Sequence, residues 1–176
     1  MSTASAPPRQ RGETCRAYYR RLTNLRDAVR RFLPVLKNDV VAWNQAQPDP
    51  LPIRHLAASM KVSPSWLHRA HPEADRGAEL VPAQHASETP LEYYVRLRSL
   101  RDAIASALPQ LLLDALNEAG SSIPRTQLAA ELGLSEGQLH KKKREAAQTT
   151  SGTRTDSPQP ADHRDASTRG SRRMPD

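Results

Sequence analysis

The 176-residue sequence is poor in aromatic residues, in cysteine and in long apolar runs. Seven aromatic residues, 4% of the chain, together with 15 prolines, indicate that part of it buries little surface and stays disordered. The single cysteine, Cys15, excludes an internal disulfide. No apolar run approaches the roughly 20 residues of a membrane span, and the N-terminal segment lacks the apolar core of a signal peptide. We therefore expect a cytoplasmic protein without a membrane segment.

Positive charge is what the sequence has in excess. It contains 26 Lys and Arg against 19 Asp and Glu, a formal net charge of +7. The charge is uneven, because residues 16–71 alone carry +7 while residues 72–91 carry −3. A strongly basic segment favours a polyanion as partner.

The four tyrosines form two Tyr-Tyr pairs, and the sequence around these pairs is repeated. Residues 18–34 and 93–109 are identical at 10 of 17 positions, and residues 52–69 and 124–141 at 7 of 18. Because both matches occur in the same order, the chain holds an internal duplication of a unit of about 55 residues. Composition sets the boundaries that we predict: a disordered tail at 1–15, the first unit at 16–72, an acidic linker at 73–91, the second unit at 92–145 and a disordered tail at 146–176.

Each unit opens with apolar residues at spacings of three and four, which place them on one face of a helix. These residues are Tyr18, Leu22, Leu25, Val29 and Phe32 in the first unit, and Tyr93, Leu97, Leu100, Ile104 and Leu108 in the second. Pro34 and Pro109 then occupy matching positions. Since proline disrupts a helix interior, we expect a break there and a second helix that ends near Asn44 or Gly120.

The most specific pattern is LAAELGLSEGQLHKK in the second unit. Leu128 and Ala129 begin a short helix, and Gly133 supplies the left-handed turn that ends it. Ser135 and Gln138 then form the capping-box pattern of a following helix. The first unit repeats this pattern as HLAASMKVSPSWLHR, with Lys61 at the turn and with Pro72 limiting the last helix to about two turns.

This pattern resembles the helix-turn-helix family of DNA-binding domains, particularly the trihelical form found in the promoter-binding region of sigma factors and in many small bacterial regulators. The resemblance implies an all-α fold of two tandem small helical units, each with a long amphipathic helix followed by a trihelical helix-turn-helix, with disordered tails. In this family the last helix enters the major groove of double-stranded DNA. The residues that would contact DNA are Ser63, Ser65, His68, Arg69, Ser135, Glu136, His140, Lys141, Lys143 and Arg144.

The resemblance thus implies a sequence-specific DNA-binding protein, a small transcriptional regulator located at the nucleoid. The predominance of Arg over Lys and the abundance of Ala favour a bacterial, phage or plasmid origin. Two units in one chain would grip two half-sites, and a flexible linker of ~20 residues could reach half-sites one turn of DNA apart. Whether both units bind DNA, and the oligomeric state, stay open at this stage.

Other interpretations remain beside this one. The Tyr/Leu stripe of the long helices could bind RNA polymerase, a replication or maintenance protein, or a second copy of the chain. An enzyme, a metal and a cofactor are not expected, since the sequence has no phosphate-binding glycine loop and His68-x-x-His71 lacks further ligands. Trp66, replaced by Gln138 in the second unit, either fills the core against its own first helix or stacks on a base.

Overall fold

The computed structural model describes residues 5–69, 78–120 and 123–152, which form six α-helices and one 3₁₀ helix and contain no strand. The all-α prediction is confirmed. The elements in chain order are α1 (Cys15–Gln45), α2 (Ile53–Ser59), α3 (Pro64–His68), η1 (Ala78–Leu80), α4 (Pro90–Ala119), α5 (Arg125–Leu132) and α6 (Glu136–Gly152). No helix in these ranges is long and apolar enough to cross a lipid bilayer.

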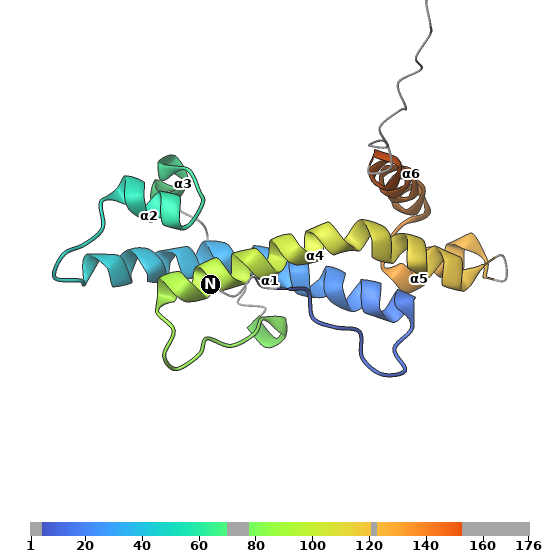
Figure 1. The fold of residues 1–176 in the computed structure, drawn as a ribbon, viewed down its shortest axis with the longest axis horizontal. Coiled ribbons are helices and arrows are strands. Elements are labelled where there is room, and N and C mark those ends of the chain that lie inside the picture. Colours follow the sequence, from blue (N-terminus) through green and yellow to red (C-terminus); the bar gives the residue numbers. More distant parts are fainter. Residues whose placement is uncertain (1–4, 70–77, 121–122, 153–176) are drawn as a thin grey trace, which may run out of the picture.

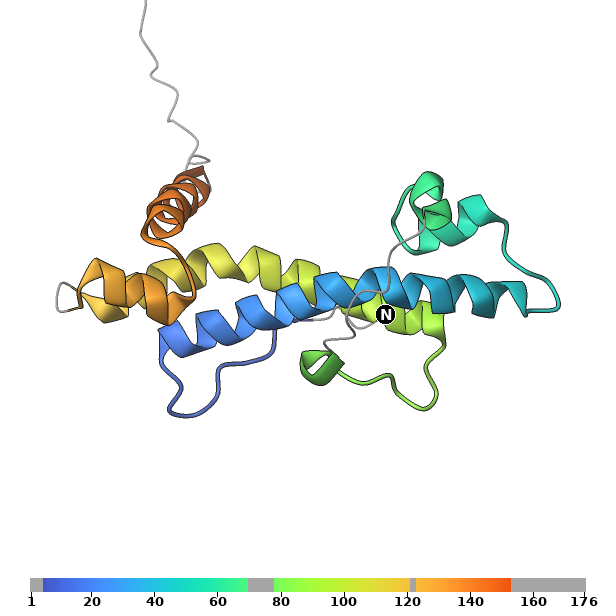
Figure 2. The same cartoon turned by 180° about the vertical axis from the view of Figure 1, so that it is seen from behind.

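The two long helices, α1 and α4, lie side by side in antiparallel orientation (Figures 1 and 2). The predicted apolar stripe of each helix forms their interface, where Leu22, Val29 and Leu97 are completely buried. Phe32 of α1 meets Tyr93 of α4 edge to face, with ring centroids 6.1 Å apart. Each unit therefore buries the stripe of its long helix against the long helix of the other unit.

The helix break expected at Pro34 and Pro109 does not occur, because both prolines lie inside the long helices. An internal proline removes one backbone hydrogen bond and costs about 3 kcal/mol. The buried face nevertheless continues beyond each proline, through Leu36 in α1 and Leu112 in α4. Packing between the long helices on both sides of the prolines outweighs the local preference, so the sequence rule was wrong here.

A loop precedes each long helix and is tied back onto it. The Tyr18 hydroxyl donates a hydrogen bond to the Pro7 carbonyl (2.7 Å), and Arg21 pairs with Glu13 (2.8 Å). Hydrogen bonding from Arg21 lowers the pKa of Glu13 to about 2. The same contacts recur 75 residues later, at 2.9 and 2.7 Å, between Tyr93 and Pro82 and between Arg96 and Glu88.

These loops extend the repeated unit toward its N-terminal side, into segments predicted as a tail and a linker. The described part of the predicted linker also packs on α1 through η1, and Val81 directly after η1 is buried. The signal in the sequence was the Glu-Thr dipeptide before each long helix, since Thr14 and Thr89 cap these helices. At the other end, α6 runs into the segment predicted as a tail, while residues 1–4 and 153–176 lie outside the described residues.

The shorter helices follow the long ones as two pairs, α2–α3 and α5–α6. The α2–α3 pair and α6 stand at opposite ends of the long helices and project from the same side of them (Figures 1 and 2). The loops before α1 and α4 lie on the opposite side (Figure 1). The predicted site and the two loops that precede α1 and α4 thus lie on opposite sides of the long helices.

Candidate nucleic-acid interface

The turn between α5 and α6 follows the geometry expected from its glycine. Gly133 adopts a left-handed backbone conformation with φ of 69°. The N–H of Leu134 donates to the carbonyl of Ala129 at 2.8 Å, which closes the end of α5. Ser135 and Gln138 then cap α6 reciprocally, with hydrogen bonds of 3.0 and 3.2 Å. The predicted capping box is confirmed.

The turn between α2 and α3 repeats this geometry without a glycine. Lys61 takes the left-handed conformation with φ of 55°, the one non-glycine residue of the described chain to have a positive φ. The N–H of Val62 donates to the carbonyl of Ala57 at 2.9 Å, as in the second unit. Ser63 caps α3 by accepting from the N–H of Trp66. A left-handed backbone at a lysine costs about 1 kcal/mol, which the glycine of the second unit avoids.

Helix α3 is held on α1 by a buried lysine. Lys37 is 2% exposed, and its Nζ donates to the carbonyl of Arg69, the C-cap of α3, at 2.6 Å. The same Nζ lies 5.4 Å from the centre of the Trp66 ring, and burial lowers the pKa of Lys37. Trp66 also packs against Tyr94 of α4, so its partly buried ring contacts the other unit as well as Lys37 of its own long helix.

The α5–α6 pair is held by different contacts. Arg16, in the first turn of α1, pairs with Glu131 of α5 at 2.9 Å. Leu139 is the buried anchor of α6, which packs on α4. The two helix pairs also differ in length, because α3 ends at His68 after five residues whereas α6 has 17. Extended backbone at Arg69 ends α3 before the two turns that Pro72 would have allowed, and Pro72 itself lies outside the described residues.

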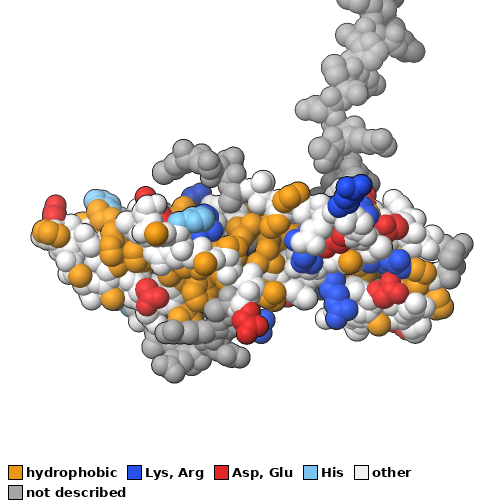
Figure 3. Space-filling view, turned by 90° about the horizontal axis from the view of Figure 1, so that it is seen from below, with side chains coloured by type: hydrophobic (Ala, Val, Ile, Leu, Met, Phe, Trp, Pro, Cys, Tyr) orange, Lys and Arg blue, Asp and Glu red, His pale blue; other side chains and the backbone are white. Residues whose placement is uncertain are grey.

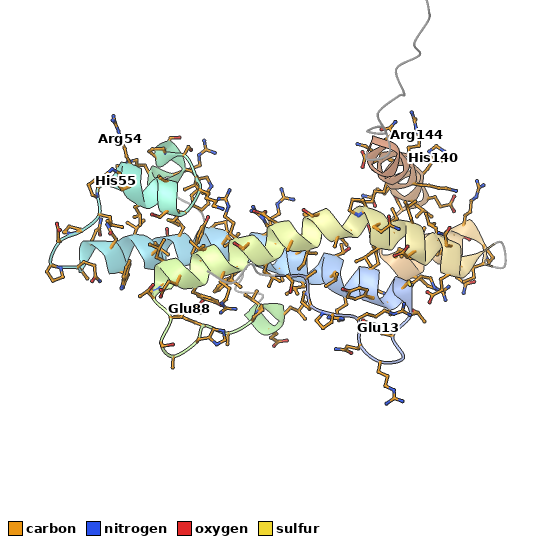
Figure 4. All side chains as sticks on the ribbon, viewed as in Figure 1. Glu13, Arg54, His55, Glu88, His140 and Arg144 are labelled. Atoms are coloured by element: carbon orange, nitrogen blue, oxygen red, sulfur yellow. The ribbon has the colours of Figure 1, made fainter. Side chains whose placement is uncertain are left out.

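All ten residues predicted to face DNA are exposed, and they fall into two groups, one for each helix pair. The first group is Ser63, Ser65, His68 and Arg69, and the second is Ser135, Glu136, His140, Lys141, Lys143 and Arg144. Figure 4 shows His140 and Arg144 on the side from which the helix pairs project. The structure adds Arg54 and His55 of α2, both exposed on that same side, which the sequence pattern did not single out.

Charges of both signs lie on the side that carries the N-terminal loops. Seen from below, Lys and Arg are interspersed with Asp and Glu and with hydrophobic side chains (Figure 3). Glu13 and Glu88 lie toward this side (Figure 4), each with an arginine partner.

The spacing of the two helix pairs follows from the register of α1 and α4. Because Phe32 lies opposite Tyr93, Leu25 lies near Leu100, its own counterpart in the repeat, at the centre of the antiparallel pair. Helix α3 is fastened at Lys37, and α6 lies over the corresponding Leu112. Each point is 12 residues from the centre, so a rise of 1.5 Å per residue puts them about 36 Å apart.

Comparison with known proteins adds no assignment, since the chain matches no protein-family model, no curated protein and no solved structure. The argument for function therefore depends on the chain's own residues and geometry. Its elements are two pairs of short helices joined by capped turns, exposed basic and hydroxyl side chains on them, and a spacing set by two packed helices.

Proposed function

We propose that this protein binds double-stranded DNA in a sequence-specific manner and reads two half-sites on one side of the duplex. The argument that carries the proposal is the estimated separation of about 36 Å between the points at which α3 and α6 attach to the long helices, since half-sites of symmetric helix-turn-helix proteins lie about 34–36 Å apart. A single chain would thereby present two DNA-reading helices, as a symmetric dimer does with two chains.

Charge and exposure support the same proposal. Lys141, Lys143 and Arg144 of α6 are exposed, and so is Arg69 at the end of α3. Lysine and serine hold phosphates, whereas arginine also pairs with guanine. Glu136 lies in the first turn of α6, where it complements the helix dipole and can accept a hydrogen bond from cytosine.

In this proposal the protein is a small transcriptional regulator of bacterial, phage or plasmid origin that acts at the nucleoid in the cytoplasm. It uses no cofactor and catalyses no reaction. A role as a module that binds RNA polymerase or a replication protein through the Tyr/Leu stripe receives less support, because Tyr18, Leu22 and Leu97 of that stripe are buried between the long helices. The predicted site residues are exposed instead, so binding of DNA receives more support than binding of a protein through the stripe.

The direct test is binding of the full chain to random duplex DNA, followed by affinity measurements on the selected sequence. Arg69→Ala tests the first helix pair, and the double variant Lys141→Ala/Arg144→Ala tests the second. Loss of each phosphate contact should reduce the slope of log affinity against log salt by about 0.9. We expect both variants to weaken binding at least tenfold at physiological salt.

Arg11→Ala provides the matched control, because Arg11 is exposed and lies in the same loop as Glu13, away from the helix pairs. It removes one positive charge without touching the proposed interface, so its affinity should stay within about twofold of the parent. Equal losses of DNA affinity in Arg11→Ala and Arg69→Ala would mean that binding depends only on the net charge of the protein. Absence of DNA binding at low salt would overturn the proposal.

A further inference from the structure

A pocket of about 260 Å³ opens between α1, α4 and α6. Its floor is apolar and comes mainly from α4, while polar side chains of α1 and α6 surround it. The lining residues are Tyr19, Arg26, Ala105, Leu108, Pro109, Leu112, Lys142 and Glu145. The contacts described above for α3 and α6 do not account for this open space.

The internal repeat identifies what occupies the related position in the first unit. There the indole of Trp66 lies between Tyr94, with ring centroids 6.3 Å apart, and the Nζ of Lys37, 5.4 Å from the ring centre. Tyr94 corresponds to Tyr19 in the repeat, and Lys37 corresponds to Leu112. Both counterparts line the pocket, so the pocket is the position at which the first unit holds an indole ring.

The second unit leaves this position open because Gln138 stands where the first unit has Trp66. Gln138 does not line the pocket. Its side chain is exposed and turned toward the start of α6, where its Oε1 accepts a hydrogen bond from the Ser135 N–H at 3.0 Å. The substitution therefore removes the ring and leaves a space already shaped by a tyrosine, a proline and leucines.

The charge of the side chains at the rim of the pocket indicates which charge a ligand of indole size should carry. Arg26 and Lys142 are positive and Glu145 is negative, and with Asp27 beside Arg26 and Lys141 beside Glu145 the five side chains carry a net charge of +1. Arg26 is held in place by Asp27 at 2.7 Å, and the Glu145 carboxylate lies 4.0 Å from Lys141. An anionic group on the ligand would complement this rim, while a flat ring would replace water over the apolar floor.

We propose that this pocket binds a small planar aromatic acid, of the size of an indole carboxylate, with the ring on the α4 floor and the carboxylate toward Arg26 and Lys142. Such a ligand bridges α4 and α6 and holds α6 in place as Trp66 holds α3. The inference does not depend on the proposed function, because the binding can be measured on the free protein without DNA.

The test uses indole-3-acetate and neutral indole as probes, with calorimetry and two-dimensional amide NMR on the full chain. A ligand of this size should bind with Kd on the order of 0.1–1 mM. We expect one site per chain, amide shifts concentrated at residues 105–112 and 142–145, and binding of indole several-fold weaker than that of the acid. Lys142→Ala should remove most of that preference for the acid.

The chain supplies its own matched variants. Gln138→Trp places the missing ring in the second unit and should weaken binding of indole-3-acetate at least tenfold, whereas Gln138→Ala should leave it within about twofold. Trp66→Ala opens the related space in the first unit and should raise the number of indole molecules bound from one to two. This third variant keeps the inference testable if Gln138→Trp does not fold.

Three results would overturn the inference. They are the absence of binding by either probe at several millimolar, unchanged binding in a folded Gln138→Trp variant, and amide shifts confined to other parts of the chain. Equal affinity for indole and indole-3-acetate would overturn the assignment of an acid.

Discussion

The distance between half-sites in the DNA should be set by the packed long helices, and spacer insertions test this directly. The starting site would be the selected sequence, with half-site centres about 10 bp apart to match the estimated 36 Å between α3 and α6. Inserting 5 bp turns one half-site about half a turn, to the opposite side of the duplex. Inserting 10 bp restores the side but separates the half-sites by about 70 Å, nearly twice the span of the two helix pairs.

The expected loss can be estimated from bivalency. When both half-sites are engaged, the second contact is intramolecular, and avidity exceeds single-site affinity by about 10²–10⁴-fold. Antiparallel packing of α1 and α4 fixes the span, so either insertion should remove this gain completely. Two domains on a flexible linker of ~20 residues would behave differently, because such a linker can extend to at most about 70 Å and would keep part of the bivalent gain with the 10-bp insertion.

Fluorescence anisotropy at one fixed salt concentration is the suitable assay, with a duplex in which one half-site is scrambled as reference. Both insertions should match this reference within a few-fold. Recovery of affinity with 10 bp, but not with 5 bp, would refute a span fixed by the long helices. Equal affinity for all spacings would refute the use of two half-sites.

Three further predictions concern stability. Leu97→Ala, at a completely buried position between the long helices, should lower the free energy of unfolding by about 2–5 kcal/mol in urea titrations, whereas Leu80→Ala, at 58% exposure, should change it by less than about 0.5 kcal/mol; similar losses would contradict the assigned core. Because the pKa of Glu13 is lowered from 4.5 to about 2, its pairing with Arg21 stabilises the fold above pH 4.5, and this contribution is lost as the pH falls toward 2. Glu13→Gln should therefore lower the free energy of unfolding at pH 7 by about 1–2 kcal/mol, a modest value because water screens the partly exposed arginine. The stability of this variant should also fall less than that of the parent as the pH is lowered. Parallel losses of stability with pH in the two proteins would argue against the pair. Pro34→Ala restores a backbone hydrogen bond inside α1 and should raise the thermal midpoint by several degrees, while a lower midpoint would show that packing requires the proline.

The parts of the fold that sequence could predict are those determined by neighbouring residues. The spacing of Leu22 and Val29 specified the buried face of a helix, and Gly133 and Ser135 specified a turn and a cap. Each of these depends on a few adjacent positions and a known backbone preference. The exposure of all ten predicted site residues follows for the same reason, since they alternate with the buried anchors Leu67 and Leu139.

The parts that sequence could not predict depend on contacts between distant segments. The pairing of α1 with α4 could not be predicted, because the apolar stripe of a helix does not determine which other surface packs against it. Once that pairing is known, the continuity of α1 through Pro34 follows from burial on both sides. The contact of Lys37 with the carbonyl of Arg69, 32 residues away, is of the same kind. It decides where α3 lies and had no local signal.

The two copies differ most where they would meet a ligand, and this distribution has a physical reason. Contacts that build the long-helix pair recur in both copies, such as Tyr18 and Tyr93 with their loop carbonyls, because each helix must cover the other along its length. At the short helices, the copies hold Trp66 against Gln138 and α3 of five residues against α6 of 17. A dimer of identical chains cannot vary one half alone, whereas a fused chain can. Under the proposed function and the proposed ligand site, the same scaffold would hold one helix in place with an internal indole and the other with a bound ligand, and would present different residues to each half-site.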